Sequence, residues 1–565
     1  MATARAAATI RPARFDARSR LAVLVALAMA CAPAGPTRPG AGAAGPTLPP
    51  GLILVIVVDQ MRADELDPRS GDGFGWIESH GRVFRQARVD HAHTETCPGH
   101  AVVLTGRQPG PAGIPGNVFV LRDSGESRYC VEDPDPATRE LTGDGGRSPR
   151  WLRVTALGDW LHEADPKARV HAVSSKDRAA IILGGQHPDG AWWMDRSLGT
   201  GFTTSHYYRD RLPDWVDRFN ARQFFDHAPS SWRHPHEGPG ERIDDYPAES
   251  PRFERASPHP VHLGDDRAAD LERLLWSPWG DEVVMRFALE LIEREQLGQR
   301  GHLDLLAVSL SSLDLVGHLY GPESRESIDA VAKLDDWLED FLDDVEDEVD
   351  EDHLWIALTS DHGVSPIPEW LAESGRSVCP IPGGRADSRA LAGALNTYLS
   401  GKLGPADGEW VQRSGYRFTV NRSIAAERHV SVADVSRESR TFLEAQRGIR
   451  RVWTAEDLEA GEGPEPYLSL YRHSWDAERG GDFEIQAEPT CLFTTYPTGT
   501  NHGTPYDYDR RVPLAFVGPG IARGSVGDPV STVDLAPTLA AFLGIPMPAG
   551  LDGRPLALGK SDSDD

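Results

Sequence analysis

Four largely apolar runs constrain the fold of this chain more than any other feature of its sequence. They read LILVIVV at residues 52–58, LDLLAVSL at 303–310, LWIALTS at 354–360 and VPLAFVG at 512–518. A strand with one solvent-facing side alternates apolar and polar residues, whereas a strand covered on both faces is apolar throughout. The runs therefore predict the strands of a parallel sheet that is covered by helices on both sides.

Helical patterns lie between these runs. In residues 327–349 the apolar positions keep a 3.6-residue period, at Ile328, Val331, Leu334, Leu338, Phe341, Leu342 and Val345. Alternation of strands and helices predicts an α/β fold with a doubly wound, mostly parallel sheet over residues 51–558. Two long segments, at about 118–270 and 372–490, are interpreted as insertions over the catalytic edge of that sheet. The tail at 559–565 is expected to be disordered.

Composition and charge narrow the class of protein. The 565 residues are 39% hydrophobic and include 15 tryptophans, which is typical of a packed globular enzyme. A net charge of −28 makes nucleic acid and anionic membrane surfaces poor partners. An acidic protein that acts on an anionic substrate must offset its own field locally, and bound metal cations would do so. The sequence predicts no particular oligomeric state.

The first thirty residues have the pattern of a secretory signal peptide. Several arginines precede an apolar run at residues 21–30, which is too short to span a membrane. Cys31 follows directly, and two interpretations stay open: a lipid anchor on Cys31, or ordinary cleavage. The Pro/Gly/Ala-rich residues 31–50 are expected to form a tether. Both interpretations predict export to the periplasm, the outer membrane or the medium.

Four further cysteines lie in the predicted domain: Cys97, Cys130, Cys379 and Cys491. Their spacing matches no zinc-binding cysteine pattern, so thiolate metal ligands are not expected. An oxidising compartment allows one or two disulfides, whose pairing cannot be deduced from the sequence.

Candidate metal ligands adjoin all four apolar runs. Asp59 follows the first, Asp314 and His318 follow the second, Asp361 and His362 follow the third, and His502 precedes the fourth. Carboxylate and imidazole ligands without thiolates suit Zn²⁺ in a hydrolytic site. Six ligands are too many for one tetrahedral zinc but suit two. A single Asp at a strand end is usually a helix N-cap, and a single His is usually polar surface, so the inference depends on the whole set.

A threonine is the candidate nucleophile. In HTETCPGHAVVLTG, Thr96 lies where Pro98 marks the first turn of a helix, and a helix N-terminus attracts anions. Thr94 and Thr105 are the competing choices. The nearby residues His91, His93 and His100 are interpreted as structural.

At these residues the chain resembles the alkaline phosphatase superfamily. The resemblance rests on VVDQMRADEL, TCPGHAVVLTG, GIPGN, SSKDRAAI, SSLDLVGH, TSDHG, TNHGTPYDYDRRVPL and STVDLAPTLAAFLGIP, which occur in the same order across nearly the whole chain. The branch that it resembles is the secreted phosphate-irrepressible (PafA-type) alkaline phosphatases, relatives of the nucleotide pyrophosphatase/phosphodiesterases. Cys97 is a departure, since relatives often have Ala or an aromatic residue after the nucleophile.

The resemblance implies roles for individual residues. One zinc would be bound by Asp314, His318 and His502, and the other by Asp59, Asp361, His362 and the oxygen of Thr96. Asn117 would donate to a phosphoryl oxygen, and Lys176 and Arg178 resemble the pair that marks monoesterases and would also hold phosphoryl oxygens.

The expected activity is hydrolysis of small phosphate monoesters through a phosphothreonine. A phosphodiesterase or nucleotide pyrophosphatase is the alternative, and a non-catalytic metal-binding module is a remote one. A sulfatase is a less favoured alternative than a phosphodiesterase, because TCPGH lacks the Arg of the sulfatase CxPxR pattern.

Overall fold

The computed structural model describes residues 48–559, except 67–71, 144, 196–198, 223–224, 226, 235–243 and 265. The predicted signal peptide, Cys31, most of the predicted tether and residues 560–565 lie outside the described residues. The described residues form one compact unit. Among the described residues, no helix has the length and apolar character needed to cross a membrane.

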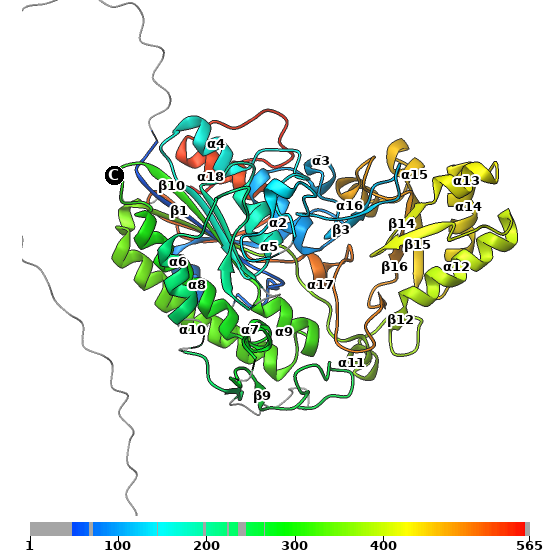
Figure 1. Cartoon of the computed structure of the whole chain (residues 1–565), viewed down its shortest axis with the longest axis horizontal. Helices are drawn as coiled ribbons and strands as arrows, with labels where there is room; N and C mark the ends of the chain where they lie inside the picture. The colour runs from blue at the N-terminus through cyan, green and yellow to red at the C-terminus, as the bar shows by residue number, and fades with distance from the viewer. Residues whose placement is uncertain are drawn as a thin grey trace, which may run out of the picture. The chain divides into compact units, whose positions relative to one another are not determined.

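A nine-stranded sheet runs through this unit (Figure 1), in the order β19-β2-β18-β11-β1-β10-β5-β6-β7. Its strands are β1 (Gly51–Val58), β2 (Arg82–Arg88), β5 (Val170–Ser174), β6 (Gly190–Asp195), β7 (Gly201–Thr203), β10 (Leu303–Leu310), β11 (Leu354–Thr359), β18 (Leu514–Val517) and β19 (Gly524–Ser531). β1 lies at the centre, parallel to β10 and β11, with Val55 in register with Ala307 and Ala357. The mostly parallel sheet confirms the predicted fold class.

One of the four predicted strands runs against the others. β18 is antiparallel to both β11 and β2, so the prediction that all four apolar runs are parallel strands was wrong at this position. Burial on both faces makes a run apolar whatever its direction, so the pattern could not distinguish the two. The reversal has a consequence for the site: a residue that precedes β18 lies at the same sheet edge as residues that follow β1, β10 and β11.

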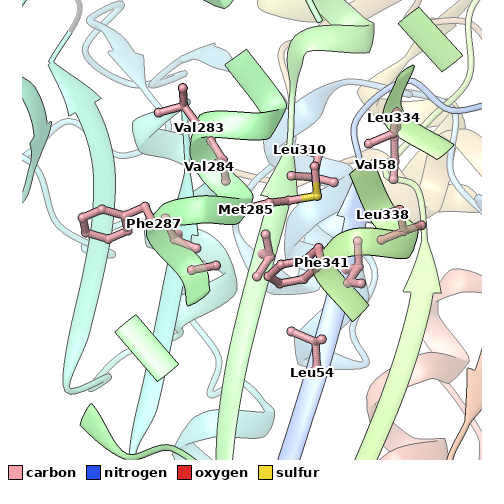
Figure 2. Packing of buried hydrophobic residues seen from close by; sticks show 14 of the residues in the cluster. Leu54, Val58, Val283, Val284, Met285, Phe287, Leu310, Leu334, Leu338 and Phe341 are labelled. Atoms are coloured by element: carbon pink, nitrogen blue, oxygen red, sulfur yellow. The ribbon is translucent and has the colours of Figure 1, made fainter. Parts of the chain in front are cut away.

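Helices cover both faces of the sheet, and alternate residues of β1 divide between the two layers. Leu54 and Val58 pack with α8 (Trp279–Glu295) and α10 (Arg325–Glu348), as Figure 2 shows. Ile53, Val55 and Val57 pack on the other face with α2 (Thr96–Thr105), α4 (Leu157–Ala164) and α18 (Leu535–Leu543). This alternation is why the run is continuously apolar. On α10 the expected core residue Ile328 is instead 47% exposed.

The two predicted insertions differ from each other. Residues 118–270 contain β5, β6 and β7, so this segment extends the main sheet and is not simply an insertion. Residues 372–490 form a separate four-stranded sheet, β13 (Val411–Ser414), β14 (Arg417–Val420), β16 (Phe483–Ala487) and β15 (Ile449–Thr454), flanked by α12 (Ser388–Leu403) and α14 (Val432–Leu443). This sheet has its own apolar core around Trp410, Phe418 and Val435.

Shorter elements complete the described chain. Further helices are α1 (Gly73–His80), α3 (Pro109–Ala112), α5 (Asp177–Gly184), α6 (Asp214–Arg222), α7 (Arg267–Leu275), α9 (Ser312–Tyr320), α11 (Pro368–Glu373), α13 (Arg422–Glu427), α15 (Ala455–Ala460), α16 (Tyr467–Ser474) and α17 (Asp507–Arg510). Short strands pair as β3 (Val118–Val120) with β4 (Ser127–Tyr129), β8 (Ser231–Trp232) with β9 (His259–Pro260), and β12 (Arg385–Asp387) with β17 (Leu492–Thr494). Two disulfides form, Cys97–Cys130 and Cys379–Cys491.

Candidate active site

The carboxyl ends of β1 and β11 bring together the first group of predicted ligands. Asp59 follows β1, and Asp361 and His362 follow β11, all fully buried. Nε2 of His362 lies 3.6 Å from Oδ1 of Asp59 and 3.4 Å from Oδ2 of Asp361. Two ligands of one tetrahedral zinc, each about 2.0–2.1 Å from the ion, are ~3.3 Å apart, so this spacing suits a shared cation.

The second group forms around Asp314 on α9. Nε2 of His318, one turn further along that helix, lies 3.2 Å from Oδ1 of Asp314, and Nε2 of His502 lies 3.6 Å from the same oxygen. The ring of His502 stacks on that of His362 with centroids 3.7 Å apart. The sheet edge therefore carries two adjoining Asp/His groups, and all six predicted ligands are in them.

Backbone carbonyls orient the three imidazoles. Each Nδ1 lies within hydrogen-bond distance of one: His318 of Thr500 O at 3.0 Å, His362 of Gly363 O at 3.0 Å and His502 of Thr94 O at 2.6 Å. A neutral imidazole that donates from Nδ1 keeps a lone pair on Nε2, which here faces the carboxylates. Burial and the neighbouring His362 and His318 hold the pKa of His502 well below its usual range, so its ring is neutral.

Buried polar atoms at this edge fit metal ions. Oδ1 of Asp59 and Nε2 of His362 have no hydrogen-bond partner among the described residues. Burial, and then the charges of Asp314 and Asp361, raise the pKa of Asp59 to about 6. Crowded carboxylates with unpaired oxygens are costly in a protein interior unless cations compensate them. The donor set of carboxylate oxygens and imidazole nitrogens suits zinc.

Lys176 lies between the two groups. Its Nζ is 2.5 Å from Oδ2 of Asp59 and 2.5 Å from Oδ2 of Asp314, and its side chain is 1% exposed. The resemblance implied a contact with a phosphoryl oxygen, whereas here the ammonium pairs with two candidate ligands. The contact with substrate stays a prediction.

Thr96 is the first residue of α2, as the position of Pro98 predicted. Its Oγ1 lies 3.5 Å from Nη2 of Arg178 on α5. The competing hydroxyls serve other partners: Thr94 donates to the carbonyl of Thr504 at 3.1 Å, and Thr105 donates to that of Ala101 at 2.6 Å. Of the three threonines, Thr96 is the one that faces a cavity.

That cavity has a volume of about 700 Å³, and predicted site residues from five separate segments line it: Thr96, Asn117, Arg178, His318 and His502. Asn117 is held in a fixed orientation. Its Oδ1 accepts from the backbone N–H of Cys97 at 2.7 Å, and its own N–H donates to Glu95 at 2.8 Å. The amide nitrogen is thus the group that Asn117 can offer to a ligand, beside the candidate nucleophile.

Two supporting residues were not predicted from the sequence. Gln60 donates from Nε2 to Oδ1 of Asp314 at 2.6 Å and from its backbone N–H to Oδ1 of Asp361 at 3.1 Å, which links the two groups. His100, interpreted only as structural, has Nδ1 3.1 Å from Oδ2 of Asp361. Position was the available signal: Gln60 adjoins Asp59, and His100 follows the candidate nucleophile by one helical turn.

A second network fixes Arg178. Oδ1 of Asp177 accepts from the hydroxyl of Tyr129 at 2.6 Å, and its Oδ2 accepts from Nε of Arg147 at 2.7 Å. The Tyr129 hydroxyl also lies 3.5 Å from Nη1 of Arg178. The Cys97–Cys130 disulfide joins the segment after β4 to the first turn of α2. The candidate nucleophile and the arginine beside it are therefore held by one cross-linked unit.

Comparison with known proteins agrees with this geometry. The family model described as type I phosphodiesterase / nucleotide pyrophosphatase matches residues 53–505. The alkaline phosphatase PhoV of Synechococcus elongatus is 31% identical over 524 residues, covering 89% of this chain and 92% of PhoV. The chain therefore belongs to the type I phosphodiesterase / nucleotide pyrophosphatase family, within the alkaline phosphatase superfamily.

Within that superfamily the chain is PafA-like, which confirms the predicted branch. The alkaline phosphatase PafA of Elizabethkingia meningoseptica is 29% identical over 521 residues, covering 90% of this chain and 94% of PafA. The crystal structure of wild-type PafA superposes with a TM-score of 0.83 at 27% identity, covering 91% of this chain and all of that one. Another solved structure, also with a TM-score of 0.83, at 26% identity and with the same coverage, is of a PafA variant substituted at one threonine, one asparagine, one lysine and one arginine.

Proposed function

We propose that this protein is an alkaline phosphatase that hydrolyses small phosphate monoesters with two zinc ions and a threonine nucleophile. The observation that carries the proposal is the convergence of two Asp/His groups, Thr96 and Arg178 at one sheet edge. Curated relatives named alkaline phosphatase, similar over most of the chain, support it. The PafA variant adds support, since its four substituted residue types are those of Thr96, Asn117, Lys176 and Arg178.

The two Asp/His groups would hold the metals. Asp314, His318 and His502 would bind one zinc, and Asp59, Asp361, His362 and the Thr96 oxygen would bind the other. When bound, zinc in such sites lowers the pKa of oxygen ligands and stabilises negative charge that develops on phosphoryl and leaving-group oxygens. The neutral ring of His502, with Nδ1 at the Thr94 carbonyl, presents the Nε2 lone pair that such a metal requires.

The protein's own groups would carry the phosphoryl transfer. The Thr96 oxygen attacks phosphorus, the bond to the leaving oxygen breaks, and a phosphothreonine forms together with the free alcohol. Water then attacks the same phosphorus, which returns the Thr96 hydroxyl and releases inorganic phosphate. The positive end of α2 and the guanidinium of Arg178 stabilise the phosphoryl oxygens, and the Asn117 amide donates to one of them.

Lys176 and Arg178 would select monoesters. A monoester dianion has three terminal oxygens, whereas a diester has one charge and a second organic group. Two charge-assisted hydrogen bonds of roughly 1.5–3 kcal/mol each, made only to the dianion, favour monoesters by about 10²- to 10⁴-fold. Cations that neutralise Asp59 and Asp314 would release the ammonium of Lys176 toward substrate.

The alternative function is that of a phosphodiesterase or nucleotide pyrophosphatase. The name of the matching family model supports it, as does the position of Lys176 against two carboxylates instead of the cavity. Arg178 at the cavity favours the monoesterase.

The decisive experiment compares p-nitrophenyl phosphate with its methyl diester, using zinc-loaded protein. We expect kcat/KM to be about 10²- to 10⁴-fold higher for the monoester, and Ala at both Lys176 and Arg178 to narrow that ratio. Thr96→Ala should remove turnover while Thr96→Ser, which keeps a hydroxyl, retains part of it. A larger rate on the diester would establish the alternative, and near wild-type turnover by Thr96→Ala would exclude the threonine nucleophile.

We also propose that this protein is exported. The N-terminal pattern at residues 1–30 supports it, and the Ala/Pro/Gly-rich segment after Cys31 suits a tether that follows a lipid anchor. Intact-mass measurement of the mature protein tests both ideas: a mass increase from acyl chains on an N-terminal Cys31 supports the anchor, whereas an unmodified N-terminus elsewhere excludes it.

A further inference from the structure

We propose a third zinc site, formed by His234, His259 and Glu326 and separate from the active site. Glu326 lies in the first turn of α10, His259 begins β9, and His234 follows β8. One donor atom from each lies within 4.8 Å of the other two. His234 and His259 belong to residues 118–270 and Glu326 to α10, and none of the three lies in a motif that carries the resemblance.

The spacing of the donor atoms suits a cation. Oε1 of Glu326 lies 3.2 Å from Nε2 of His259 and 3.4 Å from Nε2 of His234. Ligands about 2.0–2.1 Å from a tetrahedral zinc are ~3.3 Å apart, so one ion can contact all three atoms with little movement of the side chains. The Oδ1 of Asp244, 3.9 Å from Nε2 of His234, is the nearest group for a fourth position.

The hydrogen bonds of His259 point its lone pair at the carboxylate. The Tyr320 hydroxyl donates to the carbonyl of Glu254 at 2.9 Å, so it accepts from Nδ1 of His259 at 3.1 Å. The carbonyl of Phe253, 3.3 Å away, also requires a proton on Nδ1. In the neutral ring, Nε2 is then an acceptor that faces another acceptor, Glu326. A metal ion between them satisfies both, and this arrangement is how buried ligating histidines are oriented.

Burial argues for a structural site. The side chains of His234, His259 and Glu326 are 6%, 3% and 2% exposed. Nε2 of His234 is a buried nitrogen with no hydrogen-bond partner among the described residues, and it faces Glu326. Imidazole ligands favour Zn²⁺ over Mg²⁺ or Ca²⁺, which bind oxygen.

Without a metal, the same residues would be an ion pair. Glu326 would then be a carboxylate that lies 3.2 Å from Nε2 of His259 and 3.4 Å from Nε2 of His234. One protonated histidine would satisfy that carboxylate and leave the other imidazole neutral beside it. The metal satisfies both imidazoles together, which is why the geometry points to it.

A cation at the proposed site would stabilise one wall of the active-site cavity. Ser250 and Arg252 line that cavity, and the backbone N–H of Ser250 donates to the carbonyl of Leu319 on α9 at 2.9 Å. The chain then runs from these residues to His259. Because α9 also carries Asp314 and His318, the proposed site ties the cavity wall and α9 to the start of α10.

Zinc content measured by plasma mass spectrometry tests the site. After zinc loading and desalting, the wild-type protein should hold about one zinc more per chain than His259→Ala or Glu326→Gln. The matched control is Trp232→Phe, which removes the 2.6 Å hydrogen bond from Trp232 to Asp329 beside the cluster but no ligand. This control should keep the wild-type zinc content. Equal zinc content in wild type and both ligand variants would overturn the proposal.

The measured quantity is the difference in zinc content between the wild type and the ligand variants, so it is independent of the proposed function. If the active-site assignment were wrong, the total zinc content would change, but this difference would not. Anomalous diffraction at the zinc edge covers the case in which the variants do not fold. Wild-type crystals grown with zinc should give a peak among His234, His259 and Glu326. Zinc-soaked crystals with these side chains ordered and no peak between them would refute the site.

Discussion

The rings of His362 and His502 stack with centroids 3.7 Å apart and planes inclined by 22°. His362 faces Asp59 and Asp361, while His502 faces Asp314, so this stack is the boundary between the two candidate metal groups. It brings together the loop after β11 and the loop before β18. Each ring limits the position of the other, and the two candidate metal groups are therefore in direct contact through this stack.

Replacing His362 should separate the two groups in function. In His362→Ala, Asp59 and Asp361 lose their imidazole partner, so we expect loss of the zinc that they help to bind and a fall in phosphatase turnover of at least ~10³-fold. The group of Asp314, His318 and His502 keeps its ligands and should stay largely loaded. Zinc analysis and p-nitrophenyl phosphate kinetics measure the two effects.

The control for this variant is His318→Ala, which removes a ligand from the Asp314 group and leaves the ring stack in place. It should reduce zinc content by a similar amount but through the other group. If His362→Ala instead lost all active-site zinc, the stack with His502 would be essential for both groups, and the assignment of His362 to one zinc would be wrong.

The sequence was sufficient to predict the main strands of the fold. Continuously apolar runs identified β1, β10 and β11, because a strand that is buried on both faces consists mainly of apolar residues. The direction of β18 is not visible in its own residues, since it depends on how β18 pairs with β11, which is distant in the sequence. β5 and β6 went unrecognised because VHAVS and GAWWMD are short and contain polar residues.

The candidate site was predictable only in part, for a related reason. Ligand types next to strand ends are visible along the chain, and all six converge as expected. The groups that orient these ligands are not visible along the chain, because Gln60 and His100 act through contacts with residues more than two hundred positions away. The pairing of Lys176 with Asp59 and Asp314 likewise depends on three elements meeting in space.

Gly99 should tolerate no side chain. It lies in the first turn of α2, and a Cβ there would come within 2.4 Å of the backbone oxygen of Asp361, which cannot rotate away. We expect Gly99→Ala to displace α2 from β11, to lower the free energy of unfolding by about 1–3 kcal/mol and to reduce kcat by about 10²-fold through misplacement of Thr96. Urea unfolding and steady-state kinetics measure both.

The matched control is Gly393→Ala, because Gly393 is an exposed residue inside α12 with no neighbouring atom within 4 Å of the place that a Cβ would occupy. Ala has the higher helix propensity, so this change should stabilise the protein by up to about 1 kcal/mol and leave kcat unchanged. Similar effects of the two substitutions would contradict the close approach of α2 to Asp361.

Asp281 should make stability depend on pH. This residue of α8 accepts from the backbone N–H of Ser312 at 2.9 Å, and burial raises its pKa to about 7 from an ordinary 3.8. The folded state therefore binds its proton more tightly than the unfolded state. This contribution to stability is complete below pH ~4 and is lost as the pH rises to about 7, at an upper limit of ~4 kcal/mol.

Asp281→Asn keeps a hydrogen-bond acceptor and cannot ionise. The free energy of unfolding of this variant, relative to the wild type, should therefore increase between pH 5 and pH 8. Urea titrations at several pH values with fixed zinc give that difference. A difference that stays constant over this range would show that the Asp281 carboxyl does not titrate there.

The two disulfides should separate stability from activity. The Cys379–Cys491 bond spans 112 residues and the Cys97–Cys130 bond spans 33, so loss of the longer loop's cross-link should cost about 1 kcal/mol more in the free energy of unfolding. Activity should show the opposite order. Cys97 follows Thr96, and its backbone N–H holds Asn117 in place.

Paired Cys→Ser variants, one for each bond, test this reversal. We expect the variant at 379 and 491 to have the lower urea midpoint, and the variant at 97 and 130 to have the lower kcat at a temperature where both are folded. Wild-type protein treated with reductant should show both losses together. The same ranking in both measurements would mean that the Cys97–Cys130 bond contributes only to stability, and that α2 holds Thr96 and Asn117 in place without it.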